Sequence, residues 1–159
     1  MAIPVPTLFP RALINRILQH AQAQEACEVC GLIGAREGTP TTVYPVDNVA
    51  EQRESRFSLD PQQQIAAMRA MRERGEVLFA VFHSHPATPA EPSTLDMELG
   101  YPDVLQLIIS LGTRGVLELR AFRALPTGGC VEVPLLLQPE REPGPNGRPG
   151  DADQRSRGA

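Results

Sequence analysis

The stretch VLFAVFHSHP, residues 77–86, decides the fold of this chain. Its first six residues are apolar and rich in the residue types that form β-strands, so we expect a buried strand that ends near His83. Residues two apart on a strand share one face of the sheet. His83 and His85 should therefore point the same way, while Ser84 turns aside. The sequence thus predicts two imidazoles that project together from the end of a strand.

An acidic residue follows this strand within reach of both imidazoles. Three prolines between residues 86 and 92 keep the chain extended or turning, and Ser93 is typical of a helix N-cap. Asp96 would then occupy the third helical position and face back toward the strand end. Two imidazole nitrogens and one carboxylate oxygen suit a zinc ion that keeps a fourth position for water and lowers the pKa of that water to about 7. The spacing therefore predicts a zinc site formed by His83, His85 and Asp96.

Each part of this pattern also occurs without a metal. A pair of histidines at a strand end is more often structural or exposed, and Ser-x-x-Asp is a common helix-capping box. The chain has 3 histidines, and two of them fall in the one window that also holds a capping serine and an acid. That concentration favours the metal site over the purely structural interpretation.

The interval from His83 to Asp96 resembles the motif of the JAMM (MPN-type) zinc metallopeptidases, which is written H-x-H, seven residues, S, two residues, D. Every interval matches. The family also places a glutamate far upstream, before a Cys-Gly-hydrophobic strand, and Glu28 precedes the Cys-Gly pair at 30–31 in this way. The resemblance covers most of residues 10–125, and stand-alone bacterial members are the most similar. It implies an α/β (α+β) fold with a curved mixed β-sheet flanked by helices, and zinc peptidase activity.

The resemblance also implies roles for Glu28 and Ser93. As a carboxylate that is not bound to the metal, Glu28 would take a proton from the attacking water and pass it to the leaving amine. Glu25 is the rival, but it falls inside a predicted helix and lacks the Cys-Gly context. Ser93 would donate a hydrogen bond to the developing oxyanion, or cap its helix, or do both. Serine is not expected to be a nucleophile, because His20 is expected at the surface of the first helix and no other histidine is free to act as its base.

JAMM enzymes that resemble this chain hydrolyse the bond after a C-terminal Gly-Gly of ubiquitin or of ubiquitin-like sulfur-carrier proteins. The resemblance therefore implies a protein substrate of this kind. We see no insertions like those of the eukaryotic deubiquitinating members, which favours a sulfur carrier. Two alternatives stay open: a zinc peptidase of phage-tail or cell-wall peptides, and a non-catalytic MPN scaffold for protein interactions. The scaffold is disfavoured because every ligand position is filled.

Length and charge limit the remaining possibilities. The 159 residues suffice for one domain, expected over 1–137, and the Pro- and Gly-rich segment 138–159 should be a disordered tail. A net charge of -4 without a dense basic run argues against nucleic acid as a partner. No signal peptide and no apolar span of about 18 residues are present, so we expect a cytoplasmic protein with no membrane partner.

The 3 cysteines do not form a disulfide framework, because their number is odd and small. Cys27 and Cys30 could be half of a zinc knuckle or a redox pair, but no second pair completes a four-thiolate site. Alternatively, Cys30 packs in a strand as a small apolar residue and Cys27 lies at the end of the preceding helix.

The rest of the chain alternates between helical and strand patterns. A first amphipathic helix is predicted over 10–25. A second begins at Asp60 and ends at Gly75; Gln63 could complete its capping box. Its apolar stripe, expected to lie in the core, is Ile65, Met68 and Met71. Strands are predicted over 30–35, 41–46, 104–111, 115–123 and 131–137, with turns at 36–38 and 112–114.

Overall fold

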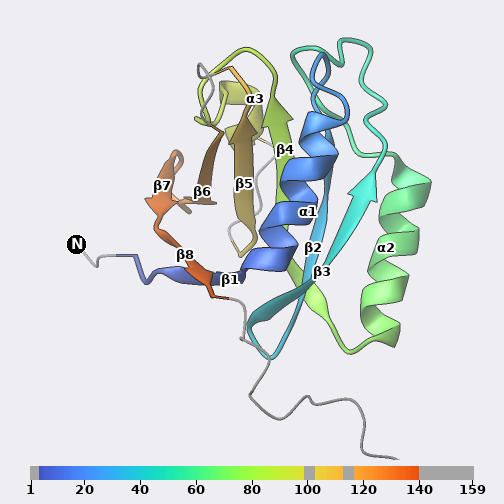
Figure 1. Ribbon diagram of the computed structural model, residues 1–159, viewed down its shortest axis with the longest axis vertical. Coiled ribbons are helices and arrows are strands. Elements are labelled where there is room, and N and C mark those ends of the chain that lie inside the picture. The colour runs from blue at the N-terminus through green and yellow to red at the C-terminus, as the bar shows by residue number, and fades with distance from the viewer. Residues whose placement is uncertain (1–3, 99–102, 113–116, 140–159) are drawn as a thin grey trace, which may run out of the picture.

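A six-stranded mixed β-sheet forms the body of the protein (Figure 1). The structure is a computed structural model that describes residues 4–98, 103–112 and 117–139. The strand order is β3-β2-β4-β5-β6-β7. These strands are β2 (Cys30–Arg36), β3 (Thr39–Val46), β4 (Val77–His85), β5 (Leu105–Ser110), β6 (Glu118–Ala124) and β7 (Cys130–Val133). The predicted α/β (α+β) class with a mixed sheet flanked by helices is confirmed.

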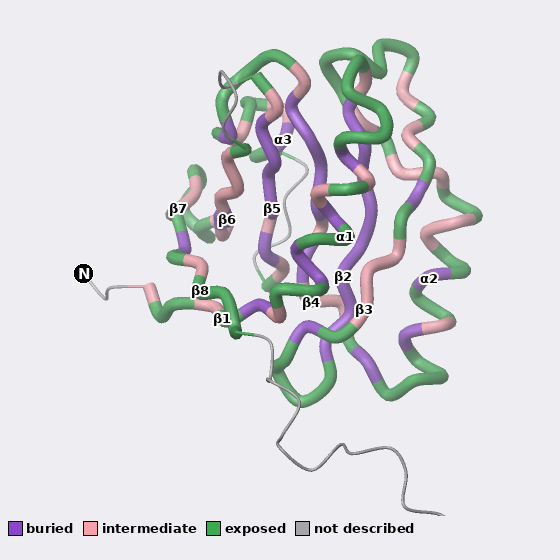
Figure 2. The backbone as a smooth tube through the Cα atoms, in the orientation of Figure 1, coloured by how far each residue is buried: buried purple, intermediate pink, exposed green. Residues whose placement is uncertain are grey.

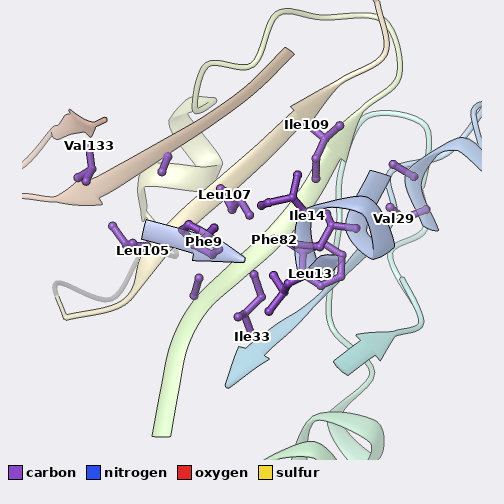
Figure 3. Packing of buried hydrophobic residues seen from close by; sticks show 14 residues of the cluster. Phe9, Leu13, Ile14, Val29, Ile33, Phe82, Leu105, Leu107, Ile109 and Val133 are labelled. Atoms are coloured by element: carbon purple, nitrogen blue, oxygen red, sulfur yellow. The ribbon is translucent and has the colours of Figure 1, made fainter. Parts of the chain in front are cut away.

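Two helices, α1 (Arg11–Gln22) and α2 (Pro61–Glu73), cover opposite faces of the sheet. Figure 3 shows Leu13 and Ile14 of α1 beside Phe82 of β4, in the largest core cluster. Val81, the preceding residue, packs instead with the cluster under α2. Because neighbouring residues of a strand point to opposite faces, His83 and His85 lie on the same face as Val81, away from α1.

The buried residues run along the central strands, as Figure 2 shows for β2, β4 and β5. The α1 side of the core holds buried residues from five of the six strands of this sheet, so it ties the sheet together. The first helix is amphipathic as predicted: of its five expected apolar residues, Leu13, Ile14, Ile17 and Ala21 are buried and Leu18 is partly buried.

The connection between β4 and β5 brings polar residues to the carboxyl end of β4. These two strands are parallel, with His85 opposite Ser110 at the end of the ladder. Parallel neighbours cannot be joined by a tight turn, so the chain must leave β4 and cross back over the sheet. The crossover contains the short helix α3 (Thr94–Glu98). It therefore carries Asp96 to the place where His83 and His85 end their strand.

The prediction of a single last strand over 131–137 is wrong. The chain forms β7 up to Val133, and then β8 (Leu135–Gln138) pairs in parallel with β1 (Thr7–Pro10) in a separate two-stranded sheet. Pro134 stands between them and has no N–H to continue the antiparallel ladder of β6 and β7. Its carbonyl instead accepts a hydrogen bond from the Thr7 N–H at 2.9 Å. The strand β1 was not predicted at all.

The start of α2 differs from prediction at Gln63. Asp60 caps the helix as expected, and its side chain accepts from the N–H groups of Gln62 and Gln63. The predicted capping box is wrong, however, because the Gln63 amide exchanges two hydrogen bonds with Asp47, both 2.8 Å. The N–H of Asp60 donates to the Asp47 carbonyl instead.

The apolar stripe predicted for α2 is only partly core. Met71 is buried, whereas Ile65 is 62% exposed and Met68 39% exposed. Ala67 takes the remaining buried position of this helix.

Some expectations fall outside the described residues. Most of the predicted tail, from residue 140 onward, and the turn residues 113–114 are among them, so the domain boundary and the tail stay predictions. Within the described part of the chain, no helix is long and apolar enough to cross a membrane. The cytoplasmic location stays a prediction.

Two leucines on strands, one buried and one exposed, test which residues form the core. Leu107 of β5 is fully buried, and Leu136 of β8 is 53% exposed. We expect Leu107→Ala to lower the free energy of unfolding by about 2–5 kcal/mol, because it leaves a cavity. The matched change Leu136→Ala should cost less than about 1 kcal/mol. Urea denaturation of both variants measures this, and equal losses would contradict the assigned core.

Candidate metal centre

Three potential ligand atoms converge at the carboxyl end of β4. Nε2 of His83 lies 3.1 Å from Nε2 of His85 and 3.1 Å from Oδ2 of Asp96. His85 Nε2 is 3.4 Å from the same carboxylate oxygen. All three residues are buried. The structure thus brings together the three residues that the sequence proposed as ligands.

The crossover after β4 fixes the orientation of His85. Its Nδ1 lies 2.8 Å from the carbonyl oxygen of Pro89, which can only accept a hydrogen bond. Nδ1 must therefore carry the proton. When the ring is neutral, this tautomer leaves Nε2 with a lone pair directed at the cluster, which is the form in which imidazole binds a metal.

Helix α3 holds Asp96 in place through a reciprocal capping interaction. The Asp96 N–H donates to Ser93 Oγ at 3.1 Å, and the Ser93 N–H donates to Asp96 Oδ2 at 2.9 Å. The predicted N-cap and third-position geometry are therefore present. The carbonyl of Asp96 also accepts from Nε2 of Gln106 at 2.7 Å, which joins α3 to β5.

The rest of the crossover is anchored on the end of β5. Ser110 Oγ donates to the Thr88 carbonyl at 2.6 Å, and the Leu111 N–H donates to the His85 carbonyl at 3.0 Å. A Cβ at Gly112 would lie 2.7 Å from the carbonyl carbon of Ala87, so only glycine allows this approach. Residues 85–88 are therefore held in place by hydrogen bonds from Ser110 and Leu111 and by close contact with Gly112.

The charge states of the cluster follow from burial and from hydrogen bonding. Burial lowers the pKa of His83. Burial acts to raise the pKa of Asp96, but the hydrogen bonds from both imidazoles outweigh it and hold this pKa below its usual value. Burial also opposes protonation of His85, yet its hydrogen bond to Asp96 raises its pKa overall. A neutral His83 and an anionic Asp96 are the forms that bind a metal.

Glu28 lies beside the cluster without joining it. It is 5% exposed, and its Oε1 is 3.8 Å from Nε2 of His85. Its Oε2 is buried and accepts no hydrogen bond within the described residues. Burial raises the pKa of Glu28 to about 7, against the attraction of His85. The rival Glu25 is exposed in the turn that follows α1, which ends at Gln22 rather than at the predicted residue 25.

The donor set and its spacing fit a zinc ion. A tetrahedral ion with ligand bonds of about 2.0–2.1 Å keeps its ligand atoms about 3.3 Å apart. The three separations of 3.1, 3.1 and 3.4 Å agree with this value. Within the described residues, these three form the group of potential ligands that could hold a metal.

The contacts of two residues at the site were not predicted from the sequence. The ring of Phe57 stacks on the His83 imidazole, with centroids 4.4 Å apart and planes at 21°. Ser84, predicted to turn aside, does so and is fully buried. Its Oγ accepts from the Val29 N–H at 2.8 Å, and its N–H donates to the Val29 carbonyl at 3.0 Å. In the sequence, only its position between two histidines indicated that Ser84 belongs to the site. Nothing in the sequence indicated that Phe57 contacts a candidate ligand.

The remaining histidine and the cysteines lie outside the cluster. His20 is half-buried rather than at the surface, and its ring packs edge-on against Phe82 on the α1 side of the sheet. Cys27 and Cys30 are both free thiols. Cys30 is buried and directs Sγ at the Val46 carbonyl, and burial raises its pKa to about 12. These features agree with the interpretation of Cys30 as a packing residue.

The chain is similar to the members of a known family. A family model described as prokaryotic homologues of the JAB domain matches residues 10–124. A CysO-cysteine peptidase of Mycobacterium tuberculosis is 33% identical over 126 residues, which are 77% of this chain and 85% of the relative. A probable TtuB-protein conjugate cleaving protease of Thermus thermophilus is 33% identical and covers 80% of this chain and 81% of its own. Tail tip assembly protein K of Escherichia phage N15 is 31% identical over 79% of this chain but only 46% of its own length.

Solved structures share the fold. The solution structure of protein DSY2949 from Desulfitobacterium hafniense has a TM-score of 0.74 and 34% identity, and the match covers 84% of this chain and 93% of that one. A JAB1/MPN domain protein from Archaeoglobus fulgidus is more distant, with a TM-score of 0.55 and 16% identity over 83% of this chain and 98% of that one. The second comparison concerns the fold alone.

Metal binding can be tested apart from activity. We expect the wild-type protein to bind about one zinc per chain and to gain about 2.7 kcal/mol of stability at a free zinc concentration 100 times the Kd. Asp96→Asn should bind far less zinc and lose this gain, because the amide carries no charge. The exposed Asp103→Asn is the matched control and should behave as wild type. Metal analysis and thermal unfolding with and without zinc measure both effects, and equal zinc binding by the two variants would exclude Asp96 as a ligand.

Proposed function

The chain belongs to the family of prokaryotic homologues of the JAB domain, and on this premise we propose that it is a zinc-dependent peptidase or isopeptidase. It hydrolyses the bond after the C-terminal Gly-Gly of a ubiquitin-like or sulfur-carrier protein. The observation that carries this proposal is the buried Glu28 carboxylate 3.8 Å from His85, beside three convergent ligand atoms. A metal-binding cluster alone would suit a structural site, whereas an adjacent free carboxylate adds the proton acceptor that hydrolysis needs.

His83, His85 and Asp96 would hold the zinc ion, which would supply Lewis acidity and activate a water molecule for attack at neutral pH. Glu28 takes the proton of the attacking water and delivers it to the leaving amine. Glu28 is suited to both steps because its carboxylate is buried beside the cluster and its Oε2 accepts no hydrogen bond within the described residues. Its position off the cluster leaves both of its oxygens available for this transfer.

Ser93 stabilises the negative charge that develops on the attacked carbonyl oxygen. Its Oγ accepts the Asp96 N–H, so the hydroxyl hydrogen remains free to donate to another acceptor. A preorganised donor of this kind contributes most when it faces charge that forms only in the transition state. Capping of α3 and oxyanion stabilisation are compatible, because they use different parts of the same hydroxyl.

The names of two relatives support a carrier-protein conjugate as the substrate. The M. tuberculosis relative is named for CysO-cysteine and the T. thermophilus relative for TtuB-protein conjugates. Both names describe cleavage of a bond between a named protein and a second group. The substrate proposed here has the same kind of bond, which follows a C-terminal Gly-Gly.

A second candidate is a peptidase of phage-tail or cell-wall peptides. It is favoured by the phage N15 relative, although this chain spans less than half of that protein. The candidates differ in what they cleave. Release of a carrier ending in Gly-Gly supports the first, and cleavage of cell-wall peptides without any action on the carrier supports the second.

The role of Glu28 is tested by its isosteric amide. We expect Glu28→Gln to bind zinc as wild type does and to lose nearly all cleavage of a Gly-Gly carrier fused through a peptide bond to a reporter. The amide cannot accept the proton. The exposed Glu25→Gln is the control and should retain full activity. Inactivity of Glu25→Gln together with full activity of Glu28→Gln would reverse the assignment.

Substitution of Ser93 separates its two roles. Ser93→Ala should lower kcat by roughly 10²–10³ if its hydroxyl stabilises the oxyanion, and should also cost about 1 kcal/mol of stability because the cap is lost. Ser93→Thr keeps a hydroxyl and should retain most of the kcat and most of the stability of wild type. Steady-state kinetics and thermal unfolding of the two variants measure this. A Ser93→Ala protein that is less stable but has the kcat of wild type would limit Ser93 to capping.

A further inference from the structure

Glu28 lies just before β2, outside the residues that pair in the sheet. It precedes β2, which begins at Cys30, so its own N–H and carbonyl take no part in strand pairing. The carboxylate nevertheless lies within 3.8 Å of His85 and is almost fully buried. Ser84 of β4 binds the neighbouring Val29, but the N–H and carbonyl of Glu28 itself need other partners.

The segment 48–58, which connects β3 to α2, binds both polar groups of the Glu28 main chain. The Glu28 N–H donates to the Arg53 carbonyl at 2.7 Å. The Glu28 carbonyl accepts from Nδ2 of Asn48 at 2.9 Å. The first contact depends on the path of the loop, and the second depends on a single side chain 20 residues away in the sequence.

Asn48 also closes the loop to which it belongs. Its Nδ2 donates a second hydrogen bond to the Arg56 carbonyl at 2.8 Å, and its Oδ1 accepts from the N–H groups of Ala50 and Ser58, both at 3.0 Å. The amide thus uses two donors and two acceptor positions, its full capacity. The loop that it closes presents the Arg53 carbonyl to Glu28 and carries Phe57, whose ring stacks on His83.

Packing leaves the Glu28 segment with room to move. A cavity of about 570 Å³ borders Glu28, Asn48 and Arg53, and His20 and Cys27 also line it. Glu28 therefore lies between this cavity and the candidate metal cluster. In such a position directional hydrogen bonds, rather than close packing, decide where the carboxylate lies.

From these contacts we propose that Asn48 is a positioning residue for Glu28. It holds the Glu28 carbonyl directly and the Glu28 N–H through the loop that it closes, and so keeps the carboxylate beside His85. This inference rests on the proposed function, because it assigns Asn48 to the proton-transfer step. It does not make Asn48 a catalytic residue, since its amide is bonded to the main chain.

Two substitutions of Asn48 separate its contacts. Asn48→Ala removes all four hydrogen bonds, whereas Asn48→Asp keeps the acceptor for Ala50 and Ser58 but loses the donor to the Glu28 carbonyl. We expect both variants to bind zinc as wild type does and to lower kcat on the Gly-Gly carrier fusion by about 10- to 100-fold, because small misplacements of a reacting group have effects of this size. KM should rise only for Asn48→Ala, where the loop opens. Asn15→Ala, on the exposed side of α1, is the control and should match wild type.

A double variant tells positioning from a general structural role. If Asn48 acts through Glu28, adding Asn48→Ala to Glu28→Gln should not lower the residual rate further, since the two changes remove the same step. Hydrogen exchange at the Glu28 amide should also speed up in Asn48→Ala, because its bond to Arg53 weakens. Wild-type kcat in both Asn48 variants, or additive losses in the double variant, would overturn the inference while the proposed function stands. A wild-type protein that binds zinc but does not cleave the fusion would instead overturn the proposed function, and with it the assignment of Asn48 to proton transfer.

Discussion

Parallel pairing between β4 and β5 obliges the chain to leave the carboxyl end of β4 and return across the sheet. The crossover cannot be a tight turn, so it provides the length in which Ser93, Asp96 and the prolines lie. One of its carbonyl groups contacts the site directly, because the Pro89 carbonyl binds Nδ1 of His85 and so fixes the tautomer of this histidine. An antiparallel neighbour would have allowed a two-residue turn and would have left the imidazoles without a carboxylate opposite them. The candidate site is in this sense a consequence of one strand pairing.

The site combines groups that are costly to bury separately. An isolated carboxylate in the interior is strongly disfavoured unless it is paired or hydrogen-bonded. Asp96 meets this requirement through both imidazoles and the Ser93 N–H, and it stays ionised. Glu28 meets it poorly, and burial raises its pKa toward neutrality. The pKa values of the two carboxyl groups thus shift in opposite directions, because Asp96 accepts hydrogen bonds that offset its burial and Glu28 accepts none within the described residues.

Two independent pieces of chain converge on the end of β4. The crossover holds His85 and Asp96 by anchoring on β5, and the 48–58 loop holds Glu28 through its main chain. Ser84 adds a third connection, because its hydroxyl and its own N–H bind Val29 next to Glu28. None of these contacts involves the reactive atoms. They fix the backbone, and the short side chains of the ligands then have little freedom left.

Local sequence was sufficient where the relevant residues are neighbours along one element. The two-residue period of a strand gave His83 and His85 a common face, and the helical start at Ser93 put Asp96 in the first turn. The same reasoning found the buried stripe of α1 and the strands β2 to β6. It failed at Pro134, where one apolar run was split between two sheets, and at Ile65 and Met68, whose apolar side chains face outward.

Tertiary structure alone decided the contacts between distant segments. Nothing near Asn48 in the sequence indicates that its amide binds Glu28, and nothing near Phe57 indicates that its ring stacks on His83. The partner of β8 is likewise a strand at the other end of the chain. Periodicity reports which residues share a face of one element, because that depends on backbone geometry over a few residues. Which elements then meet depends on how the whole core packs, so the sequence by itself determined the candidate ligands, and the fold decided what holds them and Glu28 in place.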